Sequence, residues 1–349
     1  MMYDNAGDTR NYWYAATLSK QLIENKILAI SIMEIPIVLW RDTNGTVGAL
    51  EDRCSHRNAP LSSGKIVNNC IMCPYHGWTF NNNGDCVNIP SEGPNTQRIP
   101  KKPSVHFPVQ EKHGLIWLWM GVEKTPTRNI FPLSTTNKSG MHQYFMETDF
   151  DQDVTNLIEN FMDVPHTVYV HKGWFRDVKQ IKLPVQVERK ADSVLVNYEQ
   201  SGDSIGFFNW IVNPKNLPMV HTDKFYMPNI VKVDYIFGKH EKEFIIVSTC
   251  TPISPNKTKV FTLITYNFGW VNPVAKLLLP WYTRKVINQD VKIMKLQGAT
   301  IRKFGKEKFK STQADTLHLY VESLRNYAIN KYGETTPPKP ISKTVEFWI

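Results

Sequence analysis

Two short segments decide how the first part of this chain folds: residues 54–57 read Cys-Ser-His-Arg, and residues 73–78 read Cys-Pro-Tyr-His-Gly-Trp. Each segment places a Cys two or three residues before a His, so each loop offers one sulfur and one nitrogen ligand. The four candidate ligands are Cys54, His56, Cys73 and His76. Paired loops of this kind suit a two-iron cluster in which two Cys hold one iron and two His hold the other.

Zinc is the alternative metal for this ligand set, because two Cys and two His also suit tetrahedral zinc. Zinc fingers usually pair Cys with Cys and His with His, whereas each loop here mixes the two residue types. The spacing therefore favours the iron cluster. Coincidentally buried Cys and His side chains are the remaining interpretation.

The sequence around the two loops predicts short β-strands. Residues 35–41 and 47–51 are rich in apolar and β-branched residues, and the Asn-Gly pair between them is a strong hairpin signal. Pro, Thr, Ser and Asn accumulate after residue 120 and mark a linker. We therefore expect an all-β domain over residues 10–122 and a linker over residues 123–145.

The rest of the chain, residues 146–349, alternates between helical and strand patterns. Helices are expected at 151–163, 277–304 and 314–331, the last closing the chain, and strands at 185–189, 194–199, 230–237, 244–252 and 259–268. Strands followed by helices favour an α+β domain in which helices pack on an antiparallel sheet.

A second candidate metal site lies at the end of the helix expected at 151–163. Asp163 and His166 are three residues apart and would share one helix face. His166 and His171 are five apart, which on a straight helix separates them by roughly 140°. Pro165 breaks or bends a helix, so we expect His171 to swing back towards His166. Two His and one carboxylate would complete the ligand set of a non-haem Fe(II) enzyme.

The missing carboxylate can be found by elimination. Asp290 is the one acidic residue between Glu243 and Glu307, and its neighbours three and four positions away are apolar. We therefore expect Asp290 to point inward, with Gln289 pointing to solvent. A buried carboxylate is costly unless it is paired or bound to metal, so the alternatives are an iron ligand, which we favour, and a buried salt bridge.

Together these motifs resemble the α-subunits of Rieske non-haem iron oxygenases. Segment 159–171 is similar to the family pattern Glu/Asp-Asn-x-x-Asp-x-x-His-x₄-His. Ala59 and Tyr75 stand where respiratory Rieske proteins carry an additional Cys. The likeness is therefore to the aromatic-ring-hydroxylating and vanillate O-demethylase-like group, and it covers nearly the whole chain.

The resemblance implies a fold and a set of cofactors. The expected fold is α+β, with an N-terminal all-β Rieske domain followed by a START/Bet v 1-like helix-grip catalytic domain. A Rieske 2Fe–2S cluster would be bound by Cys54, His56, Cys73 and His76, and a mononuclear Fe(II) by His166, His171 and Asp290. Asn160 and Asp163 would act in catalysis, and Asp163 would bridge a cluster His of a neighbouring subunit, best matched by His76, to an iron-binding His.

The resemblance also implies an activity. The chain would be an oxidoreductase that uses O₂ to hydroxylate or oxidatively demethylate a small aromatic or polycyclic substrate. Its electrons would come ultimately from NAD(P)H through a separate reductase or ferredoxin, and it would form a homotrimer. The alternatives are a Rieske electron-transfer protein and a helix-grip ligand-binding protein without oxygenase activity. The substrate itself does not follow from the sequence.

The distribution of charge indicates which class of partner the chain binds. The net charge is +9; residues 251–349 carry 16 basic and 6 acidic residues, hence +10, so residues 1–250 sum to −1. Because a nucleic-acid binder has no use for a redox cluster, we expect a docking face for an acidic electron donor.

No apolar run approaches the roughly 20 residues of a membrane span. Without signal-peptide features, and with five Cys, we expect a cytoplasmic protein with reduced thiols.

Overall fold

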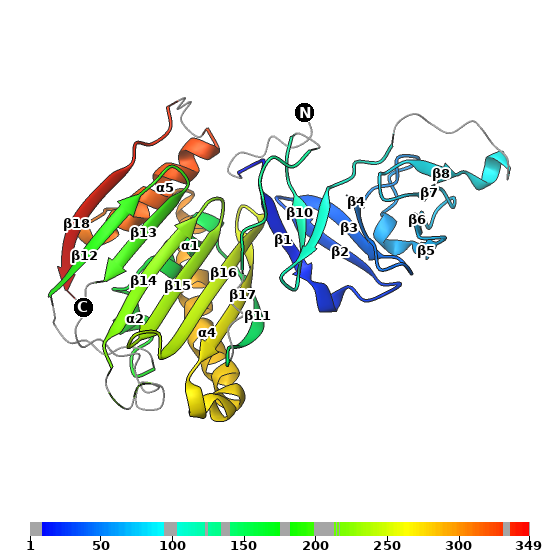
Figure 1. Ribbon diagram of the computed structural model, residues 1–349. Coiled ribbons are helices and arrows are strands. Elements are labelled where there is room, and N and C mark those ends of the chain that lie inside the picture. The colour runs from blue at the N-terminus through cyan, green and yellow to red at the C-terminus, as the bar shows by residue number, and fades with distance from the viewer. Residues whose placement is uncertain are drawn as a thin grey trace. The chain divides into compact units, whose positions relative to one another are not determined.

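The computed structural model describes residues 9–93, 103–122, 125–133, 140–174, 182–198, 213, 215, 217–330 and 336–348. The chain divides into two compact units, Met1–Pro132 and Leu133–Ile349 (Figure 1). Each unit has its own buried apolar clusters.

The N-terminal unit consists of three small antiparallel sheets, with strand orders β1-β10-β9, β2-β3-β4 and β5-β6-β7-β8. The strands are β1 Trp13–Leu18, β2 Ile27–Ile32, β3 Ile35–Arg41, β4 Val47–Glu51, β5 Lys65–Val67, β6 Cys70–Met72, β7 Thr79–Phe80, β8 Cys86–Asn88, β9 Val109–Lys112 and β10 Leu115–Trp119. One apolar cluster lies between the first two sheets, and a second surrounds Cys54 and Cys73. The expected all-β character of this unit is confirmed.

The hairpin predicted from the Asn-Gly pair is present. β3 pairs antiparallel with β4 from Ile37↔Glu51 to Arg41↔Val47. Gly45 has a φ of +81°, a conformation that a residue without Cβ adopts without steric cost. The Asp42 carboxylate accepts hydrogen bonds from the backbone N–H groups of Asn44 (2.9 Å) and Thr46 (2.8 Å). This side chain therefore fixes the turn that sets the register.

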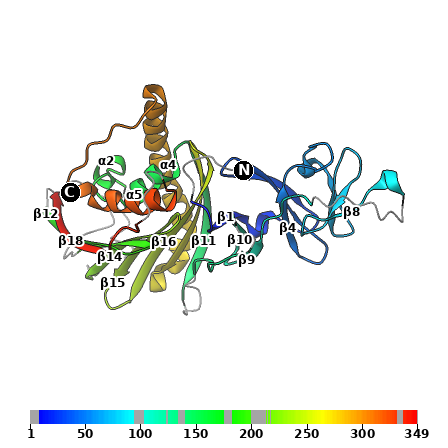
Figure 2. The same cartoon turned by 90° about the horizontal axis from the view of Figure 1, so that it is seen from above.

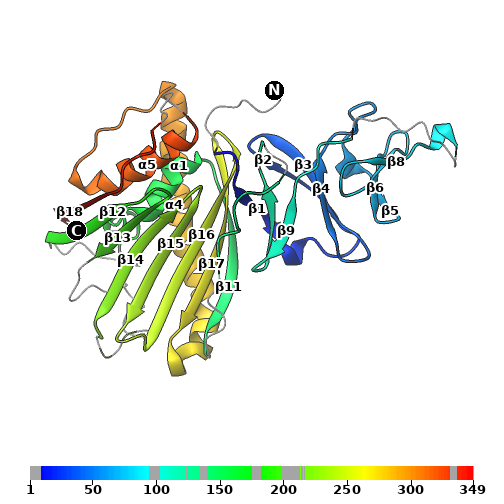
Figure 3. The same ribbon diagram turned by 45° about the horizontal axis from the view of Figure 1, so that its top comes forward.

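The C-terminal unit is one eight-stranded antiparallel sheet with the order β11-β17-β16-β15-β14-β13-β12-β18. Its strands are β11 His142–Phe150, β12 Lys182–Arg189, β13 Ser193–Tyr198, β14 Met219–Tyr226, β15 Ile230–Phe237, β16 Lys242–Ser254, β17 Lys257–Asn267 and β18 Ile341–Trp348. Strands β13 to β17 lie side by side as a broad curved surface (Figure 3).

The helices of this unit that the structure describes cover one face of the sheet (Figure 2). They are α1 Val154–Met162, α2 Thr167–Val170, α4 Asn272–Phe304 and α5 Thr316–Ala328. Asp153 is the N-cap of α1: its carboxylate accepts hydrogen bonds from the backbone N–H groups of Thr155 and Asn156. α4 ends at Gly305, which is left-handed with a φ of +72°. A sheet with helices on one face confirms the α+β expectation.

In the C-terminal unit, the sequence analysis missed three of the described strands, β11, β14 and β18. β11 begins at His142, inside the range expected as linker, and β18 rather than a helix closes the described chain. β18 is an edge strand whose side chains are mostly exposed, so it lacks the apolar alternation by which strands are recognised. β14 was missed because polar residues occupy two of its inward positions. None of the described helices is both long enough and apolar enough to cross a membrane.

Candidate active site

The two ligand loops of the N-terminal unit close in the same way. Cys54 follows β4 and Cys73 follows β6 directly. The Cys54 N–H donates to the Ala59 carbonyl, and the Cys73 N–H donates to the Trp78 carbonyl, both at 2.8 Å. Gly77 has a φ of +73°, and a Cβ at this position would lie 2.9 Å from Pro90. The second loop therefore needs glycine between its His and its Trp.

The loops bring thiol to thiol and imidazole to imidazole. The Cys54 and Cys73 thiols are close enough to influence each other's ionisation, and both are buried. The ring centroids of His56 and His76 lie 4.7 Å apart, with His76 exposed. A single tetrahedral zinc would draw all four donor atoms to one centre, whereas a two-iron cluster takes two Cys on one iron and two His on the other. Among the described residues, no three of these four side chains have ligand atoms within 4.8 Å of one another, which fits the cluster.

Two further observations fit metal binding at these loops. Burial, together with the neighbouring Cys73 thiol, raises the pKa of the Cys54 thiol to about 11. Iron binding would displace the proton, because the thiolate is the ligand. Nδ1 of His56 is buried and has no hydrogen-bond partner. An orphaned buried nitrogen is costly, and a metal ion would satisfy it.

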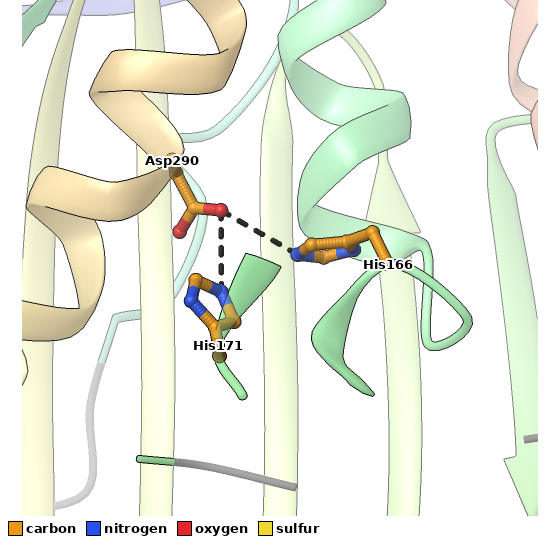
Figure 4. Close-up of side chains that lie close together, drawn as sticks. All are labelled: His166, His171 and Asp290. Atoms are coloured by element: carbon orange, nitrogen blue, oxygen red, sulfur yellow. Dashed lines mark ion pairs between the residues drawn. The ribbon is translucent and has the colours of Figure 1, made fainter. Parts of the chain in front are cut away.

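In the C-terminal unit, three side chains converge on one point (Figure 4). α1 ends at Met162 and α2 begins at Thr167, so His166 and His171 flank the short helix α2. Asp290 comes from the middle of α4. Its Oδ1 lies 3.4 Å from Nε2 of His166 and 3.2 Å from Nε2 of His171, and one candidate ligand atom from each residue lies within 4.8 Å of the other two.

The charges of this group are strongly coupled. Burial alone would raise the pKa of Asp290, but hydrogen bonds from His166 and His171 hold that pKa at about 2. Burial opposes protonation of His166, yet the carboxylates of Asp163 and Asp290 raise its pKa to about 9. A divalent cation at this point would replace the His166 proton, because metal ligation requires neutral imidazole and ionised carboxylate.

Each of the two units contains a segment that matches a known family. Residues 12–106 match the Rieske [2Fe-2S] domain. Residues 150–330, more than half of the chain, match the vanillate O-demethylase oxygenase C-terminal domain. The chain belongs to the Rieske oxygenase family. The resemblance to Rieske oxygenases that the sequence motifs indicated is therefore confirmed.

Curated Rieske relatives match parts or most of the chain. The oxygenase component of dicamba O-demethylase from Stenotrophomonas maltophilia is 37% identical over 165 residues, covering 47% of this chain and 48% of the relative. Pheophorbide a oxygenase from Oryza sativa subsp. japonica is 27% identical over 369 residues, covering 94% of this chain and 66% of the relative. The chain spans between a quarter and about two thirds of the length of the curated relatives that it matches.

Solved structures share the fold over nearly the full length. Dicamba monooxygenase bound to 3,6-dichlorosalicylic acid superimposes with a TM-score of 0.80 at 22% identity, covering 94% of this chain and 99% of that chain. NdmA of Pseudomonas putida CBB5 with caffeine superimposes with a TM-score of 0.78 at 20% identity, covering 96% of both chains.

In this Rieske oxygenase, polar side chains surround the three convergent residues. Oδ2 of Asp163 lies 3.4 Å from Nδ1 of His166. The Asn160 amide donates to Oδ1 of Asp290 at 3.3 Å. Nδ1 of His171 and Oε1 of Gln289 are 2.9 Å apart. The expectation that Gln289 points to solvent is wrong: a residue next to Asp290 on α4 is turned by only about 100°, so a long side chain still reaches the site.

A cavity of about 150 Å³ lies beside the three residues. The helices contribute His166, His171 and Asp290 to its wall, and β14 to β17 contribute a mostly apolar floor. The floor also contains His221 and Asp223, which sequence reasoning missed. His221, Asp223 and Phe225 are two residues apart, as expected for one face of a strand. Because two of them are polar, the sequence did not indicate that this face is buried.

Proposed function

We propose that this chain is the oxygenase component of a Rieske system that hydroxylates or oxidatively demethylates a small organic substrate. One observation carries the proposal: His166, His171 and Asp290 bring two imidazoles and one carboxylate to one wall of a largely apolar cavity. This donor set suits non-haem Fe(II) and keeps coordination positions open. An electron carrier or a ligand-binding module would need no such group beside its cavity.

The residues fit two different metal groups. Cys54, Cys73, His56 and His76 would hold a Rieske 2Fe–2S cluster, and His166, His171 and Asp290 a mononuclear iron. When bound, the cluster supplies single electrons and the mononuclear iron supplies O₂ activation. The burial of both thiols and the orphaned Nδ1 of His56 support the first assignment, and the convergence on Asp290 Oδ1 supports the second.

The surrounding side chains would orient the donors. A His171 tautomer that donates from Nδ1 to Gln289 leaves the Nε2 lone pair directed at Asp290. Asn160 holds one carboxylate oxygen through its amide. Asp163 supports His166 from the opposite ring nitrogen. We assign Asp163 and Asn160 to this supporting role.

The overall reaction needs two electrons and two protons. One oxygen atom of O₂ enters a C–H bond of the substrate, and the other leaves as water. Where the oxidised carbon is an O-methyl or N-methyl group, the hydroxymethyl product breaks down and releases formaldehyde. The relatives are named as a dicamba O-demethylase and a toluene-4-sulfonate monooxygenase, which supports a small aromatic or related polycyclic substrate.

Residues 10–122 would form the electron-receiving domain, residues 123–145 a linker, and residues 146–349 the catalytic domain. NAD(P)H would supply the electrons through a separate reductase or ferredoxin. We further propose a cytoplasmic homotrimer in which Asp163 of one subunit faces His76 of its neighbour. The basic segment 251–349 would receive an acidic electron donor, and its docking would then weaken as ionic strength rises.

Metal analysis with electron paramagnetic resonance tests the proposal. Protein purified without oxygen should contain about two cluster irons and about one further iron per chain. With NADH and a generic reductase, oxygen uptake should depend on a methoxylated aromatic, sterol or alkaloid substrate and should yield product. Zinc in place of iron, or reducible cluster without substrate-dependent oxygen uptake, would contradict the proposal.

A further inference from the structure

The cavity beside the three convergent residues has an unusual charge pattern. Among the described residues that line it, the acidic groups are Asp163, Asp223 and Asp290, the basic groups are histidines, and no Lys or Arg is among them. Asp163 and Asp290 contact His166 on the helical side. Asp223 comes instead from β14, so the floor carries a carboxylate of its own.

Asp223 is held by two hydrogen bonds. Its Oδ1 lies 3.0 Å from Nε2 of His221, and its Oδ2 accepts from the Tyr198 hydroxyl at 2.9 Å. All three residues are almost completely buried, with exposed fractions of 3%, 1% and 3% for Asp223, His221 and Tyr198. The two oxygens of a carboxyl group offer more acceptor positions than two partners fill, so Asp223 can accept further donors.

The neighbouring rings fix this group in place. Tyr198, His221 and Tyr235 lie directly opposite one another on β13, β14 and β15. The His221 ring is stacked between the two tyrosines, with centroid distances of 4.3 Å to Tyr198 and 4.5 Å to Tyr235 and interplanar angles of 12° and 17°. A carboxylate whose partners are packed this tightly is organised before any ligand arrives.

The floor around this group offers few other polar partners. Apart from His221, Asp223 and Tyr235 it is apolar except for hydroxyls such as Ser248 and Thr262, which contact each other at 3.2 Å. An anionic ligand would face Asp223 without a Lys or Arg to compensate. A ligand that donates a hydrogen bond, above all a cation, would gain a charge-assisted bond.

We propose that Asp223, positioned by Tyr198 and His221, recognises the substrate, and that the substrate is a single-ring compound bearing an ammonium or other N–H donor rather than a carboxylate or sulfonate. The ring size follows from the cavity, since a volume of about 150 Å³ is that of a cavity which accommodates benzene. The inference rests on the proposed function only in treating the bound molecule as the substrate.

Three probes of similar size and different charge test this inference. They are 3-methoxybenzylamine as the cation, 3-methoxybenzyl alcohol as the neutral donor and 3-methoxybenzoate as the anion. Binding to the full-length iron-loaded protein is measured by titration calorimetry without reductant, so that the result does not depend on oxygen activation. We expect the amine to bind on the order of tenfold to a hundredfold more tightly than the benzoate, with the alcohol between them.

The variant Asp223→Asn should remove the preference for the amine while changing alcohol binding by less than about threefold. The matched control is Asp234→Asn: Asp234 is equally buried, but it pairs in register with Thr222 and therefore lies on the opposite face of the sheet. This control should keep the amine preference.

Two results would overturn the inference. One is benzoate binding by the wild type as tightly as the amine, or no amine binding at millimolar concentration; this readout does not depend on any variant folding. The other is an equal loss of all three probes in Asp223→Asn, which indicates a structural role. Absence of oxygenase activity with the amine preference intact would disprove the proposed function and leave the recognition site standing.

Discussion

Oδ1 of Asp290 lies 3.2 Å from Nε2 of His171, although one residue belongs to the long helix α4 and the other follows the short helix α2. His166 approaches the same oxygen at 3.4 Å from the other end of α2. The site therefore depends on the packing of α4 against the break between α1 and α2, and each of the three side chains can be tested separately.

Replacing Asp290 by Ala should remove the mononuclear iron and leave the cluster intact. The two imidazoles alone bind a divalent cation more weakly, because the site loses its anionic ligand. Iron content should fall from about three to about two atoms per chain, with an unchanged cluster signal in electron paramagnetic resonance. The control is Asn288→Ala on the same helix, which is exposed and should retain all the iron. Full iron content in Asp290→Ala would rule out this residue as a ligand.

Replacing Gln289 by Leu should weaken iron binding without removing a ligand. Gln289 is the hydrogen-bond partner of Nδ1 of His171 at 2.9 Å, and loss of such a partner typically reduces metal affinity by about 10-fold to 100-fold. Gln289→Glu keeps an acceptor at the same position and should restore the affinity. Competition with a chelator measures the effect. Equal affinities in Gln289→Leu and the wild type would show that the bond does not orient His171.

Much of the site could be predicted because its ligands either lie close together in the sequence or, like Asp290, differ in charge from the residues around them. The two ligand loops carry their own spacing, and Asp290 is the one acidic residue in a long basic stretch. The helix break at Pro165 could be predicted from the missing N–H of proline. These features are local, so they do not require knowledge of the tertiary packing.

Other parts of the site could not be predicted, because they depend on tertiary contacts. Gln289 reaches His171 only through the packing of α2 against α4, and nothing in its own segment indicates this. Asp223 and His221 lie on β14, where inward polar residues replace the apolar alternation that marks a strand. Such residues form a pattern only when the register of β13, β14 and β15 is known.

Replacing Cys54 by Ser should abolish the Rieske cluster and leave the catalytic unit folded. Cys54 is buried and its thiolate would be one of two on the same iron, for which a hydroxyl is a poor substitute. Cluster absorption and signal should be lost, while about one iron per chain remains. The matched control is Cys86→Ser, a buried free thiol of the same unit, which should keep the cluster. Loss of the cluster in both variants would indicate a folding defect rather than a lost ligand.

Glu159 should make the protein less stable as pH rises. Burial raises the pKa of this carboxyl to about 8, and the nearby carboxylates of Glu322, Asp153 and Glu307 contribute to the shift. Between the ordinary pKa of about 4.5 and the raised value, the folded state binds more protons than the unfolded state, so the free energy of unfolding falls with increasing pH and levels off above pH 8.

The variant Glu159→Gln removes this titration while keeping the shape of the side chain. Its free energy of unfolding, measured with urea at pH 5 and pH 8, should decrease less than that of the wild type by about 3 kcal/mol. Glu241→Gln, a substitution at an exposed glutamate, controls for the loss of one negative charge and should follow the wild type. If Glu159→Gln loses as much stability between the two pH values as the wild type does, the Glu159 carboxyl is already ionised at pH 5 in the folded protein.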